Sequence, residues 1–497
     1  MKYLLGIDAG TTNVKAVIYD LAGYEIDKMV VANGNEDGET SMEDLWEKTA
    51  GAVRKLLKRT KTEMAPEKIL AVGVTGQGEG LWLLDKAGAP LMPAVLWNDG
   101  RAVMEETAVN VKTPGLGALI HRNLGCPLGR GSTLVLLQWL KNNRPEIYRA
   151  VGTVFFAKDW LRYRMTGDIA TEMTDGGTAF FKIRDCSAAD QVLTLMGIPE
   201  AIRMVPALRA PAEICGQLTE DAAKKLGLMP GMPVVTGAMD VAASVLGMGG
   251  VEEGRTVVTL GTTCGVMQVH RLEHCDLNRG VRHYLHHVAP GYRIDLLSTL
   301  NGMGSVNWAM KEIARTGNHQ VVEGIVAGAR PGCRGLIFHP YLSEAGERAP
   351  FVGTDARGSF LGIDGKTSKA ELLRAVYESV AYMVRDCLET MDRCQEIYLC
   401  GGGARSAFLC QMLADVTGKR VCIGMGSEFA AKGAAMLAGL AVGKYESWED
   451  TVAKCCRNEK IYQPNRQKAY EQSYRLYRDS RKALKTLWQM RSQILKD

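Results

Sequence analysis

The chain has 497 residues, which is too long for one hydrophobic core and predicts two domains of roughly 200 to 250 residues each. Its hydrophobic content of 46% and charged content of 23% are typical of a globular protein. The net charge of +5, from 60 basic and 55 acidic residues, excludes a densely basic nucleic-acid-binding protein. The basic excess lies mostly in residues 466–496, where the spacing indicates a solvated helix face.

The cysteines and the N-terminus indicate the compartment. Thirteen cysteines, an odd number, form neither a CxxC pair nor a zinc-ligand pattern with histidine, so we expect reduced, mostly buried thiols. The N-terminus enters an apolar run directly and lacks the parts of a signal peptide. No apolar run reaches the roughly 18 residues of a membrane span. We therefore expect a cytoplasmic protein without a membrane or nucleic-acid partner.

The first stretch with functional character is a polar turn between two apolar runs, residues 3–7 and 14–19. This pattern predicts a β-hairpin. Gly10 in the turn allows a ligand to approach the backbone closely, and Thr11 and Thr12 offer N–H and hydroxyl groups to phosphate oxygens. The turn therefore indicates a phosphate cradle, although an ordinary hairpin whose turn favours small polar residues is the alternative.

Asp8 ends the first strand of this hairpin with a carboxylate suited to hydrated Mg²⁺. The spacing is not that of a P-loop, because a second strand follows where a P-loop needs a helix. A similar pattern of strand, Gly261-Thr262-Thr263 and strand occurs about half a chain later. Two such hairpins favour a duplicated pair of domains that holds one polyphosphate from both sides.

A glycine-rich loop supplies the first candidate sugar ligands. A capping box at 41–44 predicts a helix, which leads to a buried strand at 68–75 and then to a loop with three glycines. Ligands gather beyond the carboxyl ends of such strands, so Gln77 and Glu79 in this loop are candidates for binding a polyol. A glycine-rich turn with exposed polar side chains is the alternative.

Residues 97–101, Trp-Asn-Asp-Gly-Arg, follow another short strand. Sugar sites combine an aromatic face with a few placed polar groups, which makes Trp97, Asp99 and Arg101 further candidates. Arg101 is equally suited to pairing with a structural carboxylate.

Asp240 is the candidate general base. A buried strand at 234–236 breaks at Gly237, and Asp240 falls in the first turn of the helix that follows. An acid there often serves only as a cap or helix-dipole partner. The glycine-rich run 247–254 predicts a hinge into the second half, however, so Asp240 would face the cleft between domains. This position fits a base that acts on a substrate hydroxyl.

The second half contains two segments suited to a nucleotide. The glycine-rich residues 301–305 open a predicted helix that carries Gly304 and Asn307. The strand at 396–400 leads into a glycine run and a helix N-terminus, which suits adenosine or phosphate. Candidates there are Gly402, Gly403, Ala404 and Ser406.

These motifs, in this order, resemble the FGGY family of carbohydrate kinases. Residues 358–363, followed after seven residues by 371–378, resemble the second signature of the family, and 347–351 also match. The two hairpin turns resemble its phosphate motifs, residues 402–406 its adenosine motif, and residues 237–240 the segment with its catalytic aspartate. The resemblance covers essentially the whole chain.

The resemblance implies an α/β fold with two ribonuclease H-like domains of the sugar kinase and actin superfamily around a central cleft. We place them at 1–248 and 249–497, with a helical segment from about 443. We expect an ATP-dependent kinase that phosphorylates a hydroxyl of a sugar or polyol, with Asp240 as catalytic base and Asp8 as ligand of Mg²⁺. The expected substrate ligands are Gln77, Glu79, Trp97, Asp99, Arg101 and Asp240. The expected nucleotide ligands are Thr11, Thr12, Gly261, Thr262, Thr263, Gly304, Asn307, Gly402, Gly403, Ala404 and Ser406.

Two departures from the family patterns bear on the substrate. Leu136 stands where the first signature expects a lysine, so no role is carried to that position. Gly78-Glu79 replaces the Met-His of xylulokinases and resembles L-xylulose and erythritol kinases, whereas residues 97–101 are close to the xylulokinase pattern. The substrate is thus left between a pentulose, L-xylulose or D-xylulose, and erythritol. A homodimer is left open.

Two other functions compete with this hypothesis. An actin-like or chaperone-type ATPase would share the hairpins, but would not need the loop at 76–80 or an acid placed like Asp240. A non-catalytic sugar-binding regulator would not need Asp8 and Asp240, and would usually carry a DNA-binding helix pair, which we do not find in the sequence.

Overall fold

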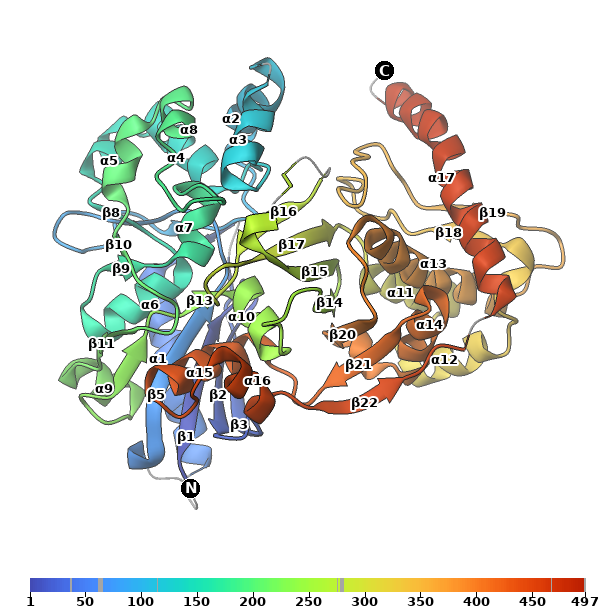
Figure 1. Ribbon diagram of the computed structural model, residues 1–497. Helices are drawn as coiled ribbons and strands as arrows, with labels where there is room; N and C mark the ends of the chain where they lie inside the picture. Colours follow the sequence, from blue (N-terminus) through green and yellow to red (C-terminus); the bar gives the residue numbers. More distant parts are fainter. Residues whose placement is uncertain are drawn as a thin grey trace.

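The computed structural model describes residues 1–35, 38–60, 66–113, 115–274, 276–277, 281–465 and 467–495. It contains two seven-stranded sheets, one from the first half of the chain and one from the second (Figure 1). None of the helices in these ranges combines the length and the apolar character that a membrane crossing requires.

The first sheet has the strand order β11-β12-β5-β1-β2-β3, with β13 beside β5. The β1–β2 pair is the expected hairpin, and its antiparallel register sets Asp8 opposite Lys15. Strand β5 is parallel to β1 and is the strand expected before the glycine-rich loop. The strands are β1 (Tyr3–Ala9), β2 (Asn13–Asp20), β3 (Glu25–Ala32), β5 (Ile69–Gly76), β11 (Ile214–Gln217), β12 (Pro233–Val235) and β13 (Ala238–Met239).

The second sheet, β16-β17-β15-β14-β20-β21-β22, repeats the pattern of the first. Antiparallel β14, β15 and β17 correspond to β1, β2 and β3, and parallel β20 lies beside β14 as β5 lies beside β1. The second hairpin is thus confirmed as a copy of the first. The strands are β14 (Thr256–Leu260), β15 (Cys264–Arg271), β16 (His283–His286), β17 (Tyr292–Thr299), β20 (Glu396–Cys400), β21 (Arg420–Gly424) and β22 (Asn458–Tyr462).

Helices pack against both sheets. Those around the first sheet are α1 (Met42–Arg59), α6 (Ala157–Thr166), α9 (Glu220–Leu226), α10 (Asp240–Gly247), α15 (Phe429–Ala441) and α16 (Trp448–Cys455). Those around the second are α11 (Met303–Ala309), α12 (His319–Ala327), α13 (Lys369–Thr390), α14 (Ala407–Thr417) and α17 (Lys468–Ile494).

Short elements between residues 82 and 208 form a smaller layer with its own apolar core, at the upper left of Figure 1. Its helices are α2 (Val103–Thr107), α3 (Leu116–Leu124), α4 (Thr133–Asn143), α5 (Pro145–Ala150), α7 (Met173–Ala179) and α8 (Asp190–Leu195). Four two-stranded pairs complete the fold: β4 (Glu39–Thr40) with β7 (Ala94–Val95), β6 (Trp82–Leu84) with β8 (Thr153–Phe155), β9 (Ala170–Thr171) with β10 (Ala207–Leu208), and β18 (Ile337–His339) with β19 (Ser359–Leu361).

Side-chain hydrogen bonds cap the N-termini of two helices, α13 and α1. Ser368 and Glu371 form both hydrogen bonds of a capping box at the start of α13, and satisfy two backbone N–H groups that the helix leaves free. Ser41 caps α1 by accepting a hydrogen bond from the backbone N–H of Asp44. The Asp44 carboxylate, however, forms an ion pair with Lys48 and does not accept from the backbone N–H of Ser41. Only half of the capping box expected there forms.

Helix α15 packs directly on the first sheet, although it comes late in the sequence. A Cβ added to Gly6 on β1 would lie 2.0 Å from the carbonyl oxygen of Ala431, and one on Gly73 of β5 would lie 1.9 Å from that of Ala434. Only glycine fits under the helix at these two positions. A helix from the second half of the chain is therefore built onto the first sheet.

The segment beyond residue 443 is not helical throughout. Strand β22 lies between α16 and α17 and pairs antiparallel with β21, which extends the second sheet by one edge strand (Figure 1). Its residues Asn458–Tyr462 are largely exposed, so they lack the apolar run by which a buried strand is found.

Candidate active site

A cavity of about 450 Å³ lies between the two halves of the chain. The first half lines it with five of the expected site residues: Thr11, Gln77, Glu79, Trp97 and Asp240. The second half contributes His283 from β16, Ser298 from β17 and Arg348 from the segment between β18 and β19. The structure thus brings together side chains that are up to 337 positions apart, from Thr11 to Arg348.

Gln77 is held at the floor of this cavity by two hydrogen bonds in series. The indole N–H of Trp97 donates to Thr11 Oγ1 at 2.9 Å, and this hydroxyl donates to Gln77 Oε1 at 2.8 Å. Gln77 is buried, and its Nε2 has no hydrogen-bond partner among the described residues. A buried donor without a partner costs free energy, so this amide indicates a ligand that supplies an acceptor such as a hydroxyl oxygen.

Glu79 lies on the glycine-rich loop with a positive φ of 60°, which is uncommon for a residue other than glycine. Its Oε2 accepts hydrogen bonds from the backbone N–H of Thr133 at 2.8 Å and from the Thr133 hydroxyl at 3.1 Å. Burial raises the pKa of the Glu79 carboxyl. Strained backbone of this kind gathers at functional sites, which agrees with the position of Glu79 in the cavity.

Asp240 begins α10 and lines the same cavity. Its Oδ1 accepts from the backbone N–H of Val241 at 2.7 Å, a contact within the first turn, whereas the N-cap residue is Met239 and makes no side-chain cap. Burial raises the pKa of this carboxyl to about 7, and the nearby charge of Asp8 adds to the effect. A carboxyl that takes up and releases a proton near neutral pH in a cleft has the property required of a general base.

Asp8 belongs to a charged cluster that the sequence analysis did not identify. Lys15 Nζ lies 3.2 Å from Asp8 Oδ2 and 3.0 Å from Glu428 Oε2. Burial disfavours the charged ammonium, but the two carboxylates outweigh this and raise the pKa of Lys15. The register of the predicted hairpin would have been enough to predict that Lys15 lies opposite Asp8. No local sequence pattern predicts that Glu428 joins them.

Asp99 and Arg101 do not line the cavity. Arg101 Nε donates to Asp99 Oδ1 at 2.7 Å and Arg101 Nη2 donates to Glu39 Oε1 at 2.6 Å. The guanidinium also lies 5.2 Å from the ring centroid of Trp139. These contacts match the structural alternative for Arg101, and the substrate role of both residues stays a prediction without a supporting contact.

The second hairpin turn is packed against α11. The backbone N–H groups of Met303 and Gly304 donate to the carbonyl oxygens of Gly261 and Thr262 at 2.9 and 3.1 Å. A Cβ on Gly304 would lie 3.1 Å from the carbonyl oxygen of Thr262, so this approach requires a small residue. Expected nucleotide residues 261, 262 and 304 are thus neighbours.

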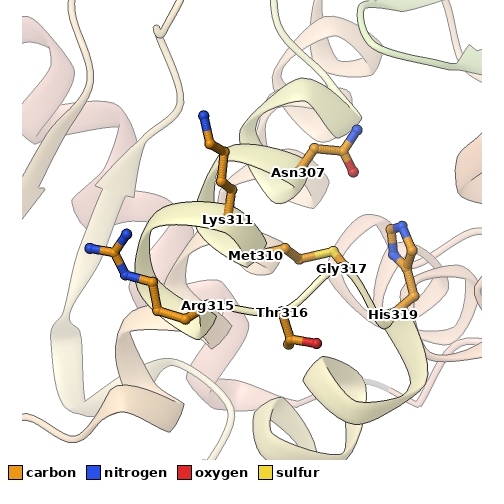
Figure 2. Close-up of a pocket in the computed structure, with 7 residues that line it drawn as sticks. All are labelled: Asn307, Met310, Lys311, Arg315, Thr316, Gly317 and His319. Carbon is orange, nitrogen blue, oxygen red and sulfur yellow. The ribbon is translucent and has the colours of Figure 1, made fainter.

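Asn307, one turn further along α11, lines a second cavity of about 510 Å³. Figure 2 shows its lining, which includes the cationic side chains of Lys311 and Arg315 and the imidazole of His319. Cations beside a cavity of this size suit a ligand that carries phosphate groups.

The glycine run after β20 forms a 3₁₀ turn, Gly402–Arg405, that leads into α14. Ser406 caps α14 and donates its hydroxyl to Glu323 Oε1 at 2.7 Å. A Cβ on Gly403 would meet the side chain of Leu260 at 2.6 Å, so this turn packs against the end of β14. The expected order of strand, glycine turn and helix N-terminus is confirmed, and the nucleotide role of these residues stays a prediction.

Comparison with known proteins gives the family. The model of the N-terminal domain of the FGGY family of carbohydrate kinases matches residues 3–247, and the model of its C-terminal domain matches residues 256–442. The chain belongs to the FGGY family of carbohydrate kinases. The class of enzyme expected from the sequence, a phosphotransferase that acts on carbohydrates, is thereby confirmed, as is the fold of two α/β domains.

Individual relatives of this FGGY kinase cover nearly all of its length. It is 33% identical to a xylulose kinase from Escherichia coli over 89% of this chain and 91% of the relative. It is 28% identical to an erythritol kinase from Brucella abortus over 98% and 97%. Its fold matches the crystal structure of a xylulose kinase from Lactobacillus acidophilus with a TM-score of 0.88, at 24% identity over 97% of this chain and 98% of the other.

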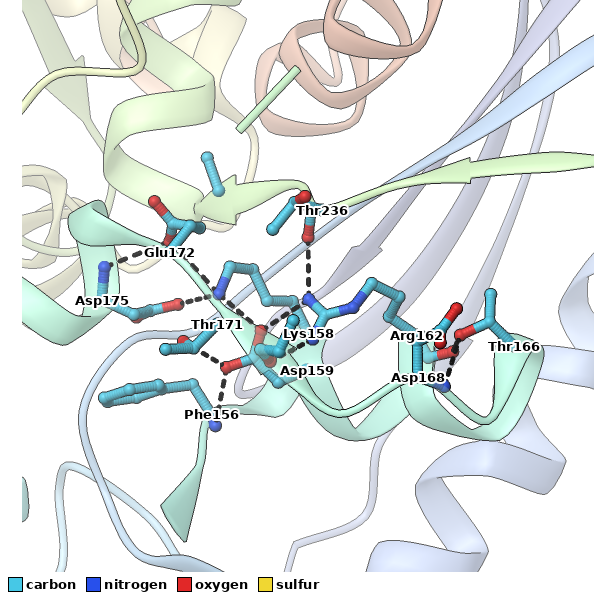
Figure 3. A network of polar contacts seen from close by, with 12 residues as sticks. Phe156, Lys158, Asp159, Arg162, Thr166, Asp168, Thr171, Glu172, Asp175 and Thr236 are labelled. Atoms are coloured by element: carbon cyan, nitrogen blue, oxygen red, sulfur yellow. Dashed lines mark hydrogen bonds and ion pairs between the residues drawn. The ribbon is translucent and has the colours of Figure 1, made fainter. Parts of the chain in front are cut away.

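Beneath the cavity of this FGGY kinase lies a fully buried charged network that the sequence analysis also missed. Figure 3 shows Lys158 on α6 surrounded by three carboxylates, with Nζ at 2.9 Å from Asp159, 3.2 Å from Glu172 and 2.8 Å from Asp175. Arg162 joins the network at 2.8 Å from Asp159. Burial and the neighbouring acids raise the pKa of Asp175 well above its usual range, while Lys158 acts in the opposite direction.

The network connects to the backbone that carries Asp240. Glu172 Oε1 accepts from the Thr174 hydroxyl at 2.7 Å, and Thr174 Oγ1 accepts from the backbone N–H of Met239 at 2.8 Å. Met239 directly precedes Asp240. The buried charges therefore fix the strand end from which the candidate base emerges.

We predict that Lys158→Met destabilises the protein by about 3 to 5 kcal/mol, because it leaves buried carboxylates without their cation. Urea unfolding followed by circular dichroism measures the loss. Lys454→Met is the matched control, since Lys454 is exposed and its pair with Asp450 on α16 is worth at most about 1 kcal/mol. Equal losses in the two variants would contradict a stabilising role for the network.

We also predict that Asp240→Asn raises the melting temperature, and by more at pH 8 than at pH 5. The pKa of Asp240 is raised from 3.8 to about 7, so the folded state prefers the protonated carboxyl. The wild type therefore loses stability as the pH rises from 3.8 to about 7, by at most about 1.4 kcal/mol per unit, whereas asparagine does not ionise.

Differential scanning calorimetry in metal-free buffer measures this difference. Asp221→Asn, which changes an exposed carboxylate on α9, should show the same melting-temperature difference from wild type at both pH values. A difference for Asp240→Asn that is constant between pH 5 and pH 8 would show that Asp240 is not protonated in the folded protein near neutral pH.

Proposed function

We propose that this FGGY kinase transfers the γ-phosphoryl group of ATP to a hydroxyl of a pentulose or a tetritol such as erythritol. The observation that carries the proposal is Asp240, a half-buried carboxyl whose pKa is raised to about 7 and which shares one cavity with the amide of Gln77 and the carboxylate of Glu79. The names of the relatives, xylulose kinase and erythritol kinase, support this range of substrates.

In the proposed reaction Asp240 accepts the proton of the attacking hydroxyl. Gln77 donates its free Nε2–H to a substrate oxygen, and the ring of Trp97 lies beside the sugar carbons. Phosphoryl transfer depends on positioning and on charge neutralisation more than on covalent chemistry, so these contacts orient the acceptor. Arg348 supplies positive charge from the opposite side of the cavity.

ATP would lie between the two hairpin turns, with Thr11, Thr12, Gly261, Thr262 and Thr263 on its β- and γ-phosphates. Gly304, Asn307 and the segment 402–406 would contact the rest of the nucleotide. The cationic cavity beside Asn307 supports this placement.

Mg²⁺ would neutralise phosphate charge during transfer, with Asp8 as its protein ligand. No cluster of three or more His, Cys, Asp or Glu side chains within the described ranges is placed to hold a metal ion. A single carboxylate, that of Asp8, fits Mg²⁺, because this ion usually keeps several waters and binds through one or two carboxylates together with substrate phosphates.

The proposal extends to the organisation of the protein. We place the domain division at residue 248, between the two matched family segments. We also propose a cytoplasmic location, because the twelve described cysteines are all unpaired, as is usual in a reducing compartment. A homodimer is compatible with this assignment.

We predict that Asp240→Asn lowers kcat on the order of 10²- to 10⁴-fold while sugar and ATP binding persist, because only the proton acceptor is removed. ADP release measured over a panel of pentuloses, pentitols, tetritols and glycerol identifies the substrate, and the same assay gives kcat. Calorimetry of sugar binding is the control. A variant with more than half of the wild-type kcat contradicts the role of Asp240, and ADP release independent of any sugar contradicts the kinase assignment.

We predict that Glu79→Gln changes kcat/KM unequally across the same panel. A site that hydrogen-bonds a hydroxyl rejects analogues without it, and a lost charged hydrogen bond costs roughly 1.5 to 3 kcal/mol, about a 10- to 100-fold change. Glutamine keeps an acceptor for Thr133, so the loop should stay folded. Glu220→Gln, an exposed charge change in the same half, is the control. An equal change for every sugar would mean that Glu79 does not select the substrate.

A further inference from the structure

A cavity of about 240 Å³ lies apart from the candidate active site and shares no lining residue with it. Its wall combines the end of α10 at Gly247 with residues of β20, β21, α15 and α16 and the start of β22 at Asn458. Helices α10 and α15 pack on the first sheet, whereas β20, β21 and β22 belong to the second. The cavity is therefore at the junction between the two halves of the kinase.

Three cationic side chains, Arg255, Lys432 and Arg457, line this cavity, and its lining contains no aspartate or glutamate. Lys432 is only 3% exposed. Its Nζ donates to the carbonyl oxygen of Met425 at 3.2 Å and lies 6.0 Å from the ring centroid of Phe429. The described residues give it no ion pair, and burial lowers the pKa of its ammonium group.

The two arginines are also without carboxylate partners in the described part of the chain. Arg255 Nη2 donates to the carbonyl oxygen of Met248 at 3.3 Å, and the guanidinium lies 3.3 Å from the ring centroid of Tyr398. Its Nε is buried and has no hydrogen-bond partner among the described residues. Arg457 Nη1 donates to the carbonyl oxygen of Ala22 at 3.0 Å.

Other buried cations of this protein do have acidic partners. Lys158 contacts three carboxylates, Arg374 pairs with Glu378 at 2.8 Å, and Arg293 pairs with Asp295 at 2.8 Å. Burying a charge without a counter-charge is costly, and charged residues are almost never fully buried unless they are paired. Lys432 is buried without such a partner, and the half-buried Arg255 and the exposed Arg457 lie at the same cavity, also without a carboxylate partner among the described residues. This cluster indicates that an anion from solution supplies the missing charge.

We propose that this cavity binds the phosphate group of a small anion, either inorganic phosphate or a short phosphomonoester. Arginine matches the geometry of phosphate oxygens with two parallel N–H groups, and a buried lysine adds a compact positive charge. The volume is below the roughly 300 to 1,000 Å³ of pockets that hold drug-sized ligands, which restricts the occupant to a small molecule.

Binding there would link the second sheet to the helices that pack on the first. Tyr398, under the Arg255 guanidinium, belongs to β20, and Lys432 belongs to α15. An anion bound by both Arg255 and Lys432 would stabilise one arrangement of the two halves, because a ligand favours the state that it binds more tightly. The site is thus suited to regulation from outside the cleft.

Isothermal titration calorimetry with potassium phosphate tests the proposal, with potassium chloride at equal ionic strength as the reference. A non-hydrolysable ATP analogue is present, so that phosphate sites in the cleft are filled. We expect saturable binding to the wild type. The affinity should fall at least tenfold in Lys432→Met and in Arg457→Gln, and should stay within about twofold in Lys460→Gln, an equal charge change on β22 outside the cavity.

If Lys432→Met does not fold, the phosphate affinity of Arg457→Gln tests the proposal by itself. Arg457 is exposed, so its replacement should leave the fold intact. Absence of saturable binding to the wild type up to about 10 mM phosphate, which corresponds to a very weak complex, overturns the proposal. Binding that survives in both cavity variants also overturns it, as does an equal loss in Lys460→Gln.

A thermal measurement gives an independent readout. Phosphate should raise the melting temperature of the wild type and not that of Lys432→Met, because a ligand stabilises only the protein that binds it. Glycerol 3-phosphate serves as a second probe. Tighter binding of inorganic phosphate identifies the free ion as the ligand, and tighter binding of glycerol 3-phosphate identifies a phosphomonoester. An equal rise in the melting temperature of the wild type and of Lys432→Met overturns the proposal.

Discussion

The ammonium of Lys15 lies between two carboxylates that come from opposite ends of the sequence, Asp8 and Glu428. Glu428 directly precedes α15, so this pair of contacts holds the start of that helix against the first hairpin. The Tyr19 hydroxyl adds a hydrogen bond of 2.9 Å to the carbonyl oxygen of Glu428. The two glycines beneath α15 allow close packing, but the charged contacts decide where along the sheet the helix begins. The position of α15 in turn sets the junction between the two halves, and with it the cleft.

The same contacts set the charges inside the cleft. Burial raises the pKa of Asp8, while the neighbouring Lys15 acts in the opposite direction. Burial raises the pKa of Asp240, which has no ion-pair partner in the described part of the chain, and the negative charge of Asp8 raises this pKa further. Burial lowers the pKa of His283 to about 4, so this imidazole is neutral at pH 7 and leaves the arginines as the cations of the lining. The two carboxylates therefore differ in their surroundings: Asp8 has the Lys15 ammonium at 3.2 Å, whereas Asp240 forms no ion pair within the described residues.

The sequence predicted the parts of the molecule that local patterns encode. Both hairpins, the strand before each glycine-rich loop, and the capped start of α13 follow from apolar periodicity and turn residues. The approach of Thr11, Gln77, Glu79 and Asp240 follows from strand ends that meet at one edge of the first sheet, whereas Trp97 follows β7 of a separate two-stranded pair. Residues that act through long-range pairing were missed. Glu428 reaches Lys15 across more than 400 positions, and no local pattern distinguishes the buried Lys158 from a surface lysine on an amphipathic helix.

The two sequence features that point to different sugars have different surroundings in the fold. Residues 97–101 resemble xylulokinases, but Asp99 and Arg101 lie outside the cavity lining, where Arg101 contacts Asp99, Glu39 and Trp139. Only Trp97 of this segment reaches the cavity, where its N–H contacts Thr11. The ion pairs of Arg101 thus stabilise the loop that carries Trp97.

The glycine-rich loop, by contrast, places its side chains in the cavity itself. Gln77 presents a free amide donor there, and Glu79 is fixed by Thr133 at the start of α4. A carboxylate anchored through one oxygen loses little conformational freedom when a hydroxyl binds, so it discriminates between substrates more sharply than a mobile side chain would. Under the proposed function, the difference between Gly-Glu and the Met-His of xylulokinases carries more weight for substrate choice than the similarity at 97–101. It favours a substrate whose hydroxyls can meet both a donor at Gln77 and an acceptor at Glu79.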